Sequence, residues 1–458
     1  MTANPADSTI LGTLYGSDAM RAVFAERQWL QYMLDVEAAL ARVQARLGIV
    51  PAAAARAIAR AARAENLDLK ELAAGTRVTG YPVVALTRAL ARAAGPGAGG
   101  YVHWGATTQD VMDTALVLQM RAGLEIVETA IARVGRALVK QALKHRRAVM
   151  AGRTHLQHAL PVTFGYKCAI WAAPLIDDVA RLKQLRERAL KVQFAGAVGT
   201  LASLGKQGRD VTEGLARELG LAAPVAPWHV SRDAVAETAC ALGIVCGSLA
   251  KFATDVVLLM QTEVAEVFEP HVPGRGGSST MPQKRNPIAC EYVLASARAA
   301  QALAPVALGA MAEDQERGTG PWQSELLALP QIFVLTAGAL EHAATIAEGM
   351  AVDTARMRRN LDLTHGLIMA EAVMMALAPR IGRDAAHDAV ERACARAIDR
   401  GMGLAEALGR EPALKGKIGR QELARLADPR GYIGEAEAVV ERVAARAKAV
   451  WGIGKKRR

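Results

Sequence analysis

The sequence predicts an all-α protein, and three observations lead to that prediction. Almost every long segment of the 458 residues spaces its apolar side chains three or four residues apart, which is the period of an amphipathic helix. Runs of β-branched and aromatic residues alternating at period two, which would indicate strands, are missing from the sequence. The apolar fraction of 52% is enough for a sizeable buried core.

The first 100 residues are expected to form an N-terminal helical domain. A helical pattern covers residues 19–48, and Gly48 followed by Pro51 ends it. Shorter helices are expected after it. The glycine-rich stretch 95–100 then indicates a loop and a domain boundary.

Residues 101–352 are expected to form a central domain of long helices. Helical patterns cover about residues 109–145, 164–193, 234–268 and 287–311. At 1.5 Å per residue, the first of these would be roughly 50 Å long. Such lengths suit an extended bundle. The apolar surface of these helices exceeds what a single bundle buries, so we expect oligomerisation.

After about residue 352 the helical patterns become shorter and more charged. Residues 353–458 are therefore interpreted as a third, smaller helical domain. The block of four basic residues at 455–458 is interpreted as a solvated tail.

Composition restricts the function classes. A net charge of +11 suits a protein that handles anions. Nucleic acid is disfavoured as that anion, because aromatic residues make up 4% of the chain and zinc-finger or ribonucleoprotein motifs are missing.

Cysteine usage and the N-terminus indicate the compartment. The five cysteines are odd in number and scattered, so we expect buried free thiols. The N-terminus lacks a secretory pattern, and no run of about 18 apolar residues is found. We therefore expect a cytoplasmic protein that does not associate with a membrane.

The most informative segment is HVPGRGGSSTMPQKRNP, residues 271–287. Its glycines and prolines permit a backbone whose amide groups point inward to an anion. Lys284 and Arg285 add positive charge, and Asn286 adds an amide. Pro287 is expected at the first position of the next helix, whose N-terminus favours anions. This loop therefore suits a substrate that bears carboxylates, and a connector without function is the alternative.

The string GSSTMPQKRNP within this loop resembles the signature of the fumarase/aspartase superfamily. That superfamily includes fumarases, aspartases, argininosuccinate and adenylosuccinate lyases, and 3-carboxy-cis,cis-muconate cycloisomerases. The resemblance covers essentially the whole chain. It implies three helical domains, with the long helices forming the core of a homotetramer and each active site assembled from segments of different subunits.

The resemblance also implies roles for residues of the loop. In the family, the first serine of the pair removes a proton from a carbon that bears a carboxylate, which implies Ser278 as the catalytic base. A serine hydroxyl ionises only in a dry site that stabilises its oxyanion. The implied substrate-binding residues of the loop are Ser279, Met281, Lys284 and Asn286.

Two further segments resemble family motifs. In YVHWGATTQD, residues 101–110, the resemblance implies that His103, Thr107 and Thr108 contact the substrate, with a helix N-terminus helping to hold a carboxylate. Taken alone, His103 beside an aromatic residue would be structural.

The second segment is GRTHLQHA, residues 152–159. It resembles the Arg-Thr-His segment of the carbon–nitrogen lyases and implies His155 as a general acid, a role that suits an imidazole near neutral pH. Thr154 and Gln157 are the implied substrate-binding residues beside it. For His158, hydrogen-bonded packing is at least as good an interpretation.

Arg232 matches a weaker family element that binds substrate from another subunit, and an ordinary Arg-Asp ion pair is the alternative. Metal-ligand spacing is missing from the histidines and cysteines, so we expect neither a metal nor another cofactor. The expected ligand is a small anionic carboxylate.

The branch of the family leaves two functions open. Segments 357–367 and 370–373 resemble bacterial 3-carboxy-cis,cis-muconate cycloisomerases of aromatic compound catabolism. The closest cycloisomerases are expected to carry tryptophan at the position of His155 and histidine at that of Gln283. These departures suggest the alternative of a carbon–nitrogen lyase that releases fumarate from an N-substituted aspartate, such as iminodisuccinate or adenylosuccinate. An inactive homologue is a third reading, which the presence of Ser278, Lys284 and Asn286 disfavours.

Overall fold

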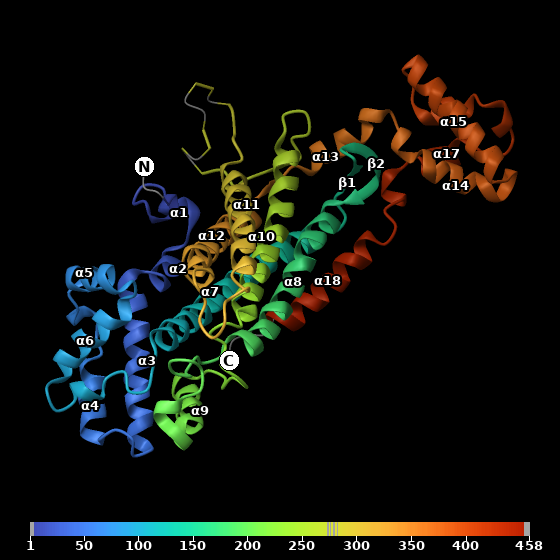
Figure 1. The fold of residues 1–458 in the computed structure, drawn as a ribbon. Helices are drawn as coiled ribbons and strands as arrows, with labels where there is room; N and C mark the ends of the chain where they lie inside the picture. Colours follow the sequence, from blue (N-terminus) through green and yellow to red (C-terminus); the bar gives the residue numbers. More distant parts are fainter. Residues whose placement is uncertain (1–3, 273, 275, 278–279, 282, 453–458) are drawn as a thin grey trace. The chain divides into compact units, whose positions relative to one another are not determined.

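The computed structural model describes residues 4–272, 274, 276–277, 280–281 and 283–452. Within them the chain is mainly helical (Figure 1), which confirms the predicted fold class. Two antiparallel ribbons that the sequence analysis did not predict interrupt the helices. In the first, β1 (Val149–Thr154) pairs with β2 (Gln157–Thr163). In the second, β3 (Val267–Phe268) pairs with β4 (Ala351–Val352).

The chain divides into two compact units. Unit 1 consists of Met1–Ile131, Asp178–Ala250 and Tyr292–Glu341. Unit 2 consists of Ala132–Asp177, Lys251–Glu291 and His342–Arg458. The division into three domains at residues 100 and 352 stays a prediction.

Short helices dominate the first hundred residues. They are η1 (Pro5–Asp7), α1 (Gly12–Tyr15), α2 (Asp18–Val23), α3 (Glu26–Arg46), α4 (Ala52–Ala61), η2 (Ala64–Asn66), α5 (Leu69–Thr79), α6 (Pro82–Ala94) and η3 (Gly99–Tyr101). The single helix predicted over residues 19–48 is wrong in one respect, because Ala25 takes an extended conformation with ψ 143° and separates α2 from α3. The buried face of α3 includes Met33 and Leu34 and joins a core with Ile58 and Leu86.

Five long helices follow. They are α7 (Thr108–Lys144), α8 (Phe164–Ala189), α10 (Asp233–Met260), α11 (Ile288–Gly309) and α12 (Pro321–Gly349), with η4 (Ala202–Gln207) and α9 (Gly208–Leu219) between α8 and α10. The first four confirm the predicted helices. Helix α10 ends at Met260, earlier than predicted, because residues 261–264 form a turn in which Gln261 O accepts from Val264 N–H and Ala265 N–H, and the chain then enters β3.

The C-terminal part has the shorter helices that the sequence predicts. They are α13 (Thr354–Leu361), η5 (Asp362–Thr364), η6 (Leu367–Met369), α14 (Ala370–Ile381), α15 (Arg383–Arg400), α16 (Leu404–Gly409), η7 (Pro412–Leu414), α17 (Arg420–Leu426), η8 (Pro429–Gly431) and α18 (Ala436–Trp451). Helices α14 to α17 enclose their own small core, which includes Leu377, Val390 and Leu404.

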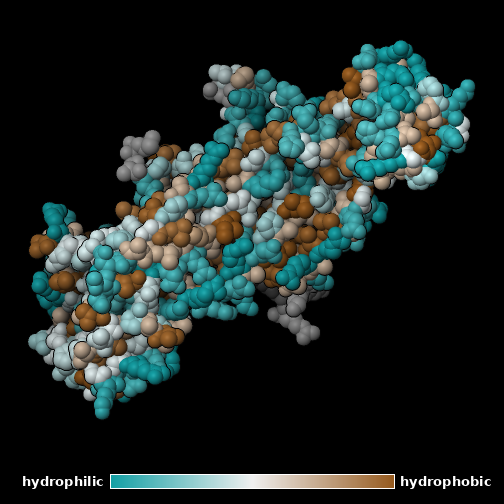
Figure 2. Space-filling view, turned by 45° about the vertical axis from the view of Figure 1, so that its right-hand side comes forward, coloured by the Kyte–Doolittle hydropathy of each residue, from teal (hydrophilic) through white to brown (hydrophobic). Residues whose placement is uncertain are grey.

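Apolar surface remains exposed on the long helices. Hydrophobic side chains gather in patches on the face drawn in Figure 2. Leu327 of α12 is 68% exposed and Ile244 of α10 is 46% exposed. By length and composition both helices could cross a membrane, although 50% of the most apolar window of α10 and 67% of that of α12 is buried within the chain. This corrects the expectation that the chain has no segment of that kind.

All five cysteines are free, as the sequence predicts. Cys168, Cys246 and Cys290 are buried, whereas Cys240 and Cys394 are half-buried. Burial raises the pKa of the Cys246 thiol to about 11, so this thiol stays protonated and packs as an apolar group.

An aromatic cluster supports unit 2 close to the hairpin of β1 and β2. Trp171 is 2% exposed and lies between Phe164 and Phe252, with ring centroids 5.9 and 5.1 Å away. Its indole Nε1 donates a 2.7 Å hydrogen bond to Asp255. Trp171 therefore contributes both apolar burial and a satisfied polar contact.

We expect Trp171→Ala to destabilise the protein by about 3–5 kcal/mol, because it opens a cavity and removes a partner of Asp255. Arg147→Ala is the control, because the side chain of Arg147 is 74% exposed and forms a surface ion pair with Glu437. It should cost less than about 1 kcal/mol. Urea unfolding checks both values, and equal losses would contradict this account of the cluster.

Candidate functional site

The first predicted site segment lies in unit 1, just before and at the start of α7. Thr108 is the first residue of α7 and Thr107 precedes it, which confirms that a helix begins at this pair. Both threonines are half-buried. The N-terminus of the 37-residue helix α7 therefore lies beside two hydroxyl groups, an arrangement suited to an anion.

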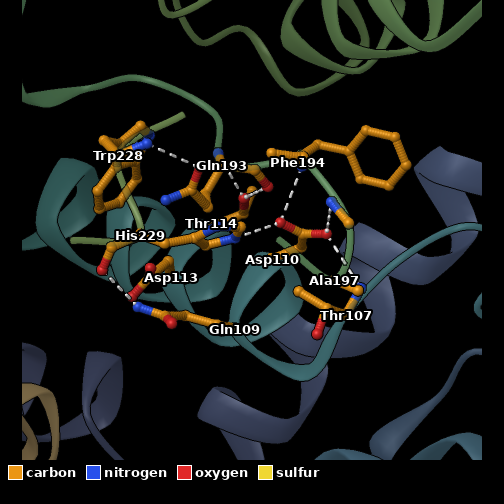
Figure 3. Close-up of polar contacts among 12 residues, drawn as sticks. Thr107, Gln109, Asp110, Asp113, Thr114, Gln193, Phe194, Ala197, Trp228 and His229 are labelled. Carbon is orange, nitrogen blue, oxygen red and sulfur yellow. Dashed lines mark hydrogen bonds and ion pairs between the residues drawn. The ribbon is translucent and has the colours of Figure 1, made fainter. Parts of the chain in front are cut away.

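A buried carboxylate, that of Asp110, holds this turn (Figure 3). Its Oδ2 accepts hydrogen bonds from the backbone N–H groups of Thr107, at 3.0 Å, and Gly196, at 2.9 Å. Its Oδ1 accepts one from Ala195 N–H at 2.9 Å and lies 2.7 Å from His229 Nε2. Asp110 is 1% exposed and His229 is 3% exposed. One side chain thus ties three segments of unit 1 together.

Thr114 and Gln109 extend the same network (Figure 3), and Gln109 in turn binds Arg317. Thr114 exchanges hydrogen bonds with the backbone of Gln193, at 2.8 and 2.9 Å. The amide of Gln109 donates to His229 O at 2.9 Å. Its Oε1 accepts from Arg317 Nη1 at 2.7 Å, and Arg317 Nη2 donates to Ala197 O.

Arg317 was missed by the sequence analysis. It is a cation held against Gln109, the residue next to Thr108. The only signal available was its position in the polar stretch AEDQERGTG between two apolar helical segments.

His103 is held in an uncommon conformation with φ +61°. Its backbone N–H donates to Glu37 Oε2 at 3.0 Å, and its ring Nδ1 lies 2.5 Å from Glu37 Oε1. Burial lowers the pKa of His103, but the hydrogen bond and charge of Glu37 and the charge of Asp110 outweigh it and leave that pKa above its ordinary value. The geometry thus favours an imidazolium at this position.

Arg232 lies deep inside unit 1 and is 0% exposed. Its guanidinium donates two hydrogen bonds to Asp113, at 2.9 and 3.0 Å, and two to Glu325, at 2.9 and 2.5 Å. It also lies 5.0 Å from the centroid of the Trp228 ring. Burial lowers the pKa of Arg232, but the two carboxylates more than offset this and hold the pKa above its ordinary value. The arrangement favours a structural role over the predicted contact with substrate.

The second predicted segment forms the turn between β1 and β2 in unit 2. His155 and Leu156 have φ +52° and +62°, so both central residues of the two-residue hairpin turn are left-handed. Thr154, His155 and Gln157 are exposed, and Leu156 is 68% exposed. The implied acid His155 thus lies at the tip of a hairpin.

A buried ion pair anchors this hairpin. Arg153 donates to both oxygens of Glu266, at 2.9 and 2.8 Å, and Glu266 is 0% exposed. Asn360 of α13 donates to the same carboxylate at 2.7 Å. Burial and then the charge of Arg153 lower the pKa of the nearby His158, which favours its neutral form.

The third predicted segment is the loop over residues 271–287 in unit 2, of which Ser278 and Ser279 lie outside the described residues. The base of the loop is closed, because Gly277 pairs with Arg285 in an antiparallel bridge and Asn286 N–H donates to Gly276 O at 3.0 Å. Gly276 has φ +69°, and a Cβ there would lie 2.8 Å from Asn286 O.

The helix after the loop is capped by an acid. The carboxylate of Glu269 accepts from Ala289 N–H at 3.1 Å and Cys290 N–H at 2.8 Å. Helix α11 begins at Ile288, so the prediction that Pro287 is its first residue is wrong by one position. Met281 and Lys284 are exposed, and Asn286 is half-buried.

The structure groups the predicted residues by unit. His103, Thr107, Thr108 and Arg232 belong to unit 1. Thr154, His155, Gln157, Met281, Lys284 and Asn286 belong to unit 2. Among the described residues, the one cluster with metal-ligand geometry is the exposed trio His387, Asp388 and Glu391 on α15, and exposed acidic groups like these are common without an ion.

Known proteins are similar to this chain over nearly its whole length. The lyase family model matches residues 15–301, and the model of the adenylosuccinate lyase C-terminus matches residues 366–443. A 3-carboxy-cis,cis-muconate cycloisomerase from Pseudomonas aeruginosa is 50% identical over 93% of this chain and 94% of its own length.

Two solved structures are also similar to this chain over nearly its whole length. A 3-carboxy-cis,cis-muconate lactonizing enzyme from Pseudomonas putida has a TM-score of 0.92 at 44% identity, covering 97% of this chain and 100% of that one. A fumarate lyase from Mesorhizobium sp. BNC1 has a TM-score of 0.89 at 47% identity, covering 94% and 98%.

The geometry of Arg232 gives a prediction that separates its two possible roles. Arg232→Ala leaves Asp113 and Glu325 buried without their partner, so we expect a loss of about 3–5 kcal/mol in unfolding free energy. Arg133→Ala, which breaks an exposed pair with Glu348, is the control and should cost about 1 kcal/mol or less. A stable Arg232→Ala protein with a raised KM would instead restore the role in substrate binding.

Proposed function

The chain belongs to the lyase family of the fumarase/aspartase superfamily, and on this premise we propose that it interconverts 3-carboxy-cis,cis-muconate and its lactone. The observation that carries the proposal is the 50% identity, over 93% of the chain, to a cycloisomerase named for that substrate. The chain would act on a small tricarboxylate in the cytoplasm, within aromatic compound catabolism.

The proposed chemistry takes place on a carbon next to a carboxylate. In the lactone-forming direction, a carboxylate oxygen adds to a double bond, and the adjacent carbon is protonated. In the reverse direction Ser278 removes that proton, and the negative charge moves onto the neighbouring carboxylate. Lys284 and Asn286, together with the Thr107 and Thr108 pair, stabilise this doubly charged group. When the negative charge returns to the carbon chain as a double bond, the lactone C–O bond breaks and the ring oxygen leaves as a carboxylate.

The described geometry supports the binding part of this proposal. Thr107 and Thr108 lie at the N-terminus of α7, where backbone N–H groups and the helix dipole favour an anion. The raised pKa of His103 adds positive charge next to this turn. Lys284 is exposed on the loop that carries Ser278. These features suit a substrate with several carboxylates.

We further propose that the enzyme is a homotetramer in which unit 1 of one chain and unit 2 of others complete each active site. Supporting observations are the exposed hairpin tip with Leu156 and the exposed apolar side chains of α10 and α12, such as Ile244 and Leu327. Apolar surface of this kind is stabilised when subunits cover it.

The second candidate is a carbon–nitrogen lyase that releases fumarate from an N-substituted aspartate. The observation that favours it is His155, an exposed imidazole at a hairpin tip, at a position where the resemblance to cycloisomerases leads us to expect tryptophan. In that reaction His155 would protonate the departing nitrogen. A relative named as a fumarate lyase, at 47% identity, is compatible with this candidate.

An ultraviolet assay of the purified protein separates the two candidates. We expect turnover of 3-carboxy-cis,cis-muconate at ordinary enzyme efficiency, with kcat/KM above about 10⁴ M⁻¹s⁻¹. Iminodisuccinate and adenylosuccinate are assayed in parallel for fumarate. Fumarate release without muconate turnover would replace the cycloisomerase proposal with the second candidate.

Two variants test the assigned roles on whichever substrate reacts. Ser278→Ala should lower kcat by at least about 10³-fold, because it removes the proton-abstracting group. For the muconate, His155→Trp should keep kcat within about tenfold, whereas an acid for a leaving nitrogen would lose roughly 10²–10⁴-fold. Gel filtration verifies the assembly of both variants. A fully active Ser278→Ala protein would contradict the mechanism.

A further inference from the structure

We propose that Glu37 is a positioning residue for substrate binding, which orients the ring of His103 and keeps it charged so that Nε2 donates to a carboxylate of the substrate. The inference rests on the proposed function and on the contact between His103 and the substrate that the family resemblance implies, and it adds a residue from α3 to that site. Glu37 itself would not touch the substrate, because it is 1% exposed.

The first observation is that a single carboxylate engages His103 twice. Oε2 of Glu37 accepts the backbone N–H of His103, and Oε1 lies 2.5 Å from the ring Nδ1. The backbone contact holds a residue at φ +61°, a conformation that non-glycine residues rarely adopt. The ring contact fixes the rotation of the imidazole. Because Nδ1 faces the buried carboxylate, Nε2 is left for the open side of a side chain that is 23% exposed.

The second observation is a neutral contact from the same helix. Gln44 lies seven residues after Glu37, which places both side chains on one face of α3. Its Nε2 donates to Trp104 O at 2.7 Å, and Gln44 is 0% exposed. An amide therefore already holds the backbone of this segment. A neutral side chain is thus sufficient to hold a backbone group of this segment, whereas the negative charge of Glu37 lies against the imidazole of His103.

The third observation concerns charge balance. The charged groups that act on the His103 ring are Glu37 from α3 and Asp110 from α7. Asp110 is satisfied by three backbone N–H groups and by His229. Within the described part of the chain, Glu37 forms hydrogen bonds with His103 alone. A buried carboxylate is costly without a charged or hydrogen-bonding partner, so a cationic His103 stabilises it.

The sign of the pH dependence follows from this pairing. The pKa of His103 is raised, so the imidazolium is present at low pH and is lost as the pH rises through that pKa. Binding of a polycarboxylate should weaken over the same range. Without the charge of Glu37, only Asp110 opposes the effect of burial on the pKa of His103. This pKa should therefore be lower, and the loss of binding should begin at lower pH.

Titration of histidines by NMR tests the pairing in the ligand-free enzyme. The chain has 9 histidines, so ¹³Cε1-histidine labelling gives few signals, and His103→Gln identifies the one that matters. We expect the pKa of His103 to lie above that of a free histidine in the wild type and to fall in Glu37→Gln. A wild-type His103 that titrates at or below the ordinary value would overturn the proposal, even if Glu37→Gln fails to fold.

Kinetics with 3-carboxy-cis,cis-muconate test the consequence for binding. Glu37→Gln should raise KM roughly tenfold with kcat within about threefold, and the rise of KM with pH should shift to lower pH. Gln44→Ala is the matched control: it loosens the same segment without changing its charge, so its KM profile should keep the wild-type pH dependence. Equal pH profiles for the two variants would reduce Glu37 to a structural role.

The proposed substrate and the proposed role of Glu37 can be rejected separately. If the enzyme does not turn over the muconate, citrate serves as a tricarboxylate probe, and its addition should shift the His103 signal in the wild type but less in Glu37→Gln. That result would leave the role of Glu37 standing while the proposed substrate falls. A His103 signal insensitive to citrate and to every substrate tested would reject the inference itself.

Discussion

The site in unit 1 depends on the burial of one carboxylate, that of Asp110. Moving a carboxylate out of water costs several kcal/mol unless hydrogen bonds replace those of the solvent. The chain supplies them from Thr107, from residues 195–196 and from His229, which come from three separate segments. Because any displaced segment would leave the charge unsatisfied, the start of α7 has one favourable arrangement, and Thr107 and Thr108 are held beside the helix N-terminus.

Buried acids play the same part elsewhere in the chain. Glu266 engages Arg153 and Asn360 beneath the hairpin that carries His155, and Glu269 caps α11 after the loop over residues 271–287. In both cases the acid is a supporting residue, whereas His155 and Lys284, which are proposed to meet the substrate, are exposed. Such support preorganises a site, because the position of the outer group is fixed before the ligand binds.

The sequence was sufficient for the fold class and for four long helices, because their apolar periodicity extends over many turns. Boundaries were less predictable: the extended Ala25 between α2 and α3 and the early end of α10 depend on local backbone conformations with little compositional signal. The hairpin over residues 149–163 was missed because its turn places His155 and Leu156, rather than glycine or asparagine, in the left-handed region.

The candidate site was predicted mainly through resemblance to a family, which singled out the loop with Ser278 and the segments around His103 and His155. The partners of these residues could not be predicted from one sequence, because they are remote along the chain: Glu37 lies 66 residues from His103, and Asp113 lies 119 residues from Arg232. Charge pattern alone likewise could not distinguish a buried Arg232 from one that binds substrate.

If each active site takes His103 from one chain and Ser278 from another, activity must be recoverable from two defective chains. The direct measurement unfolds and refolds an equimolar mixture of His103→Ala and Ser278→Ala proteins and compares kcat/KM with that of each parent treated alone. Random assembly predicts recovery of about a quarter of the wild-type value, because one site in four then combines two intact segments. A mixture no more active than the mean of its parents would contradict the shared-site architecture.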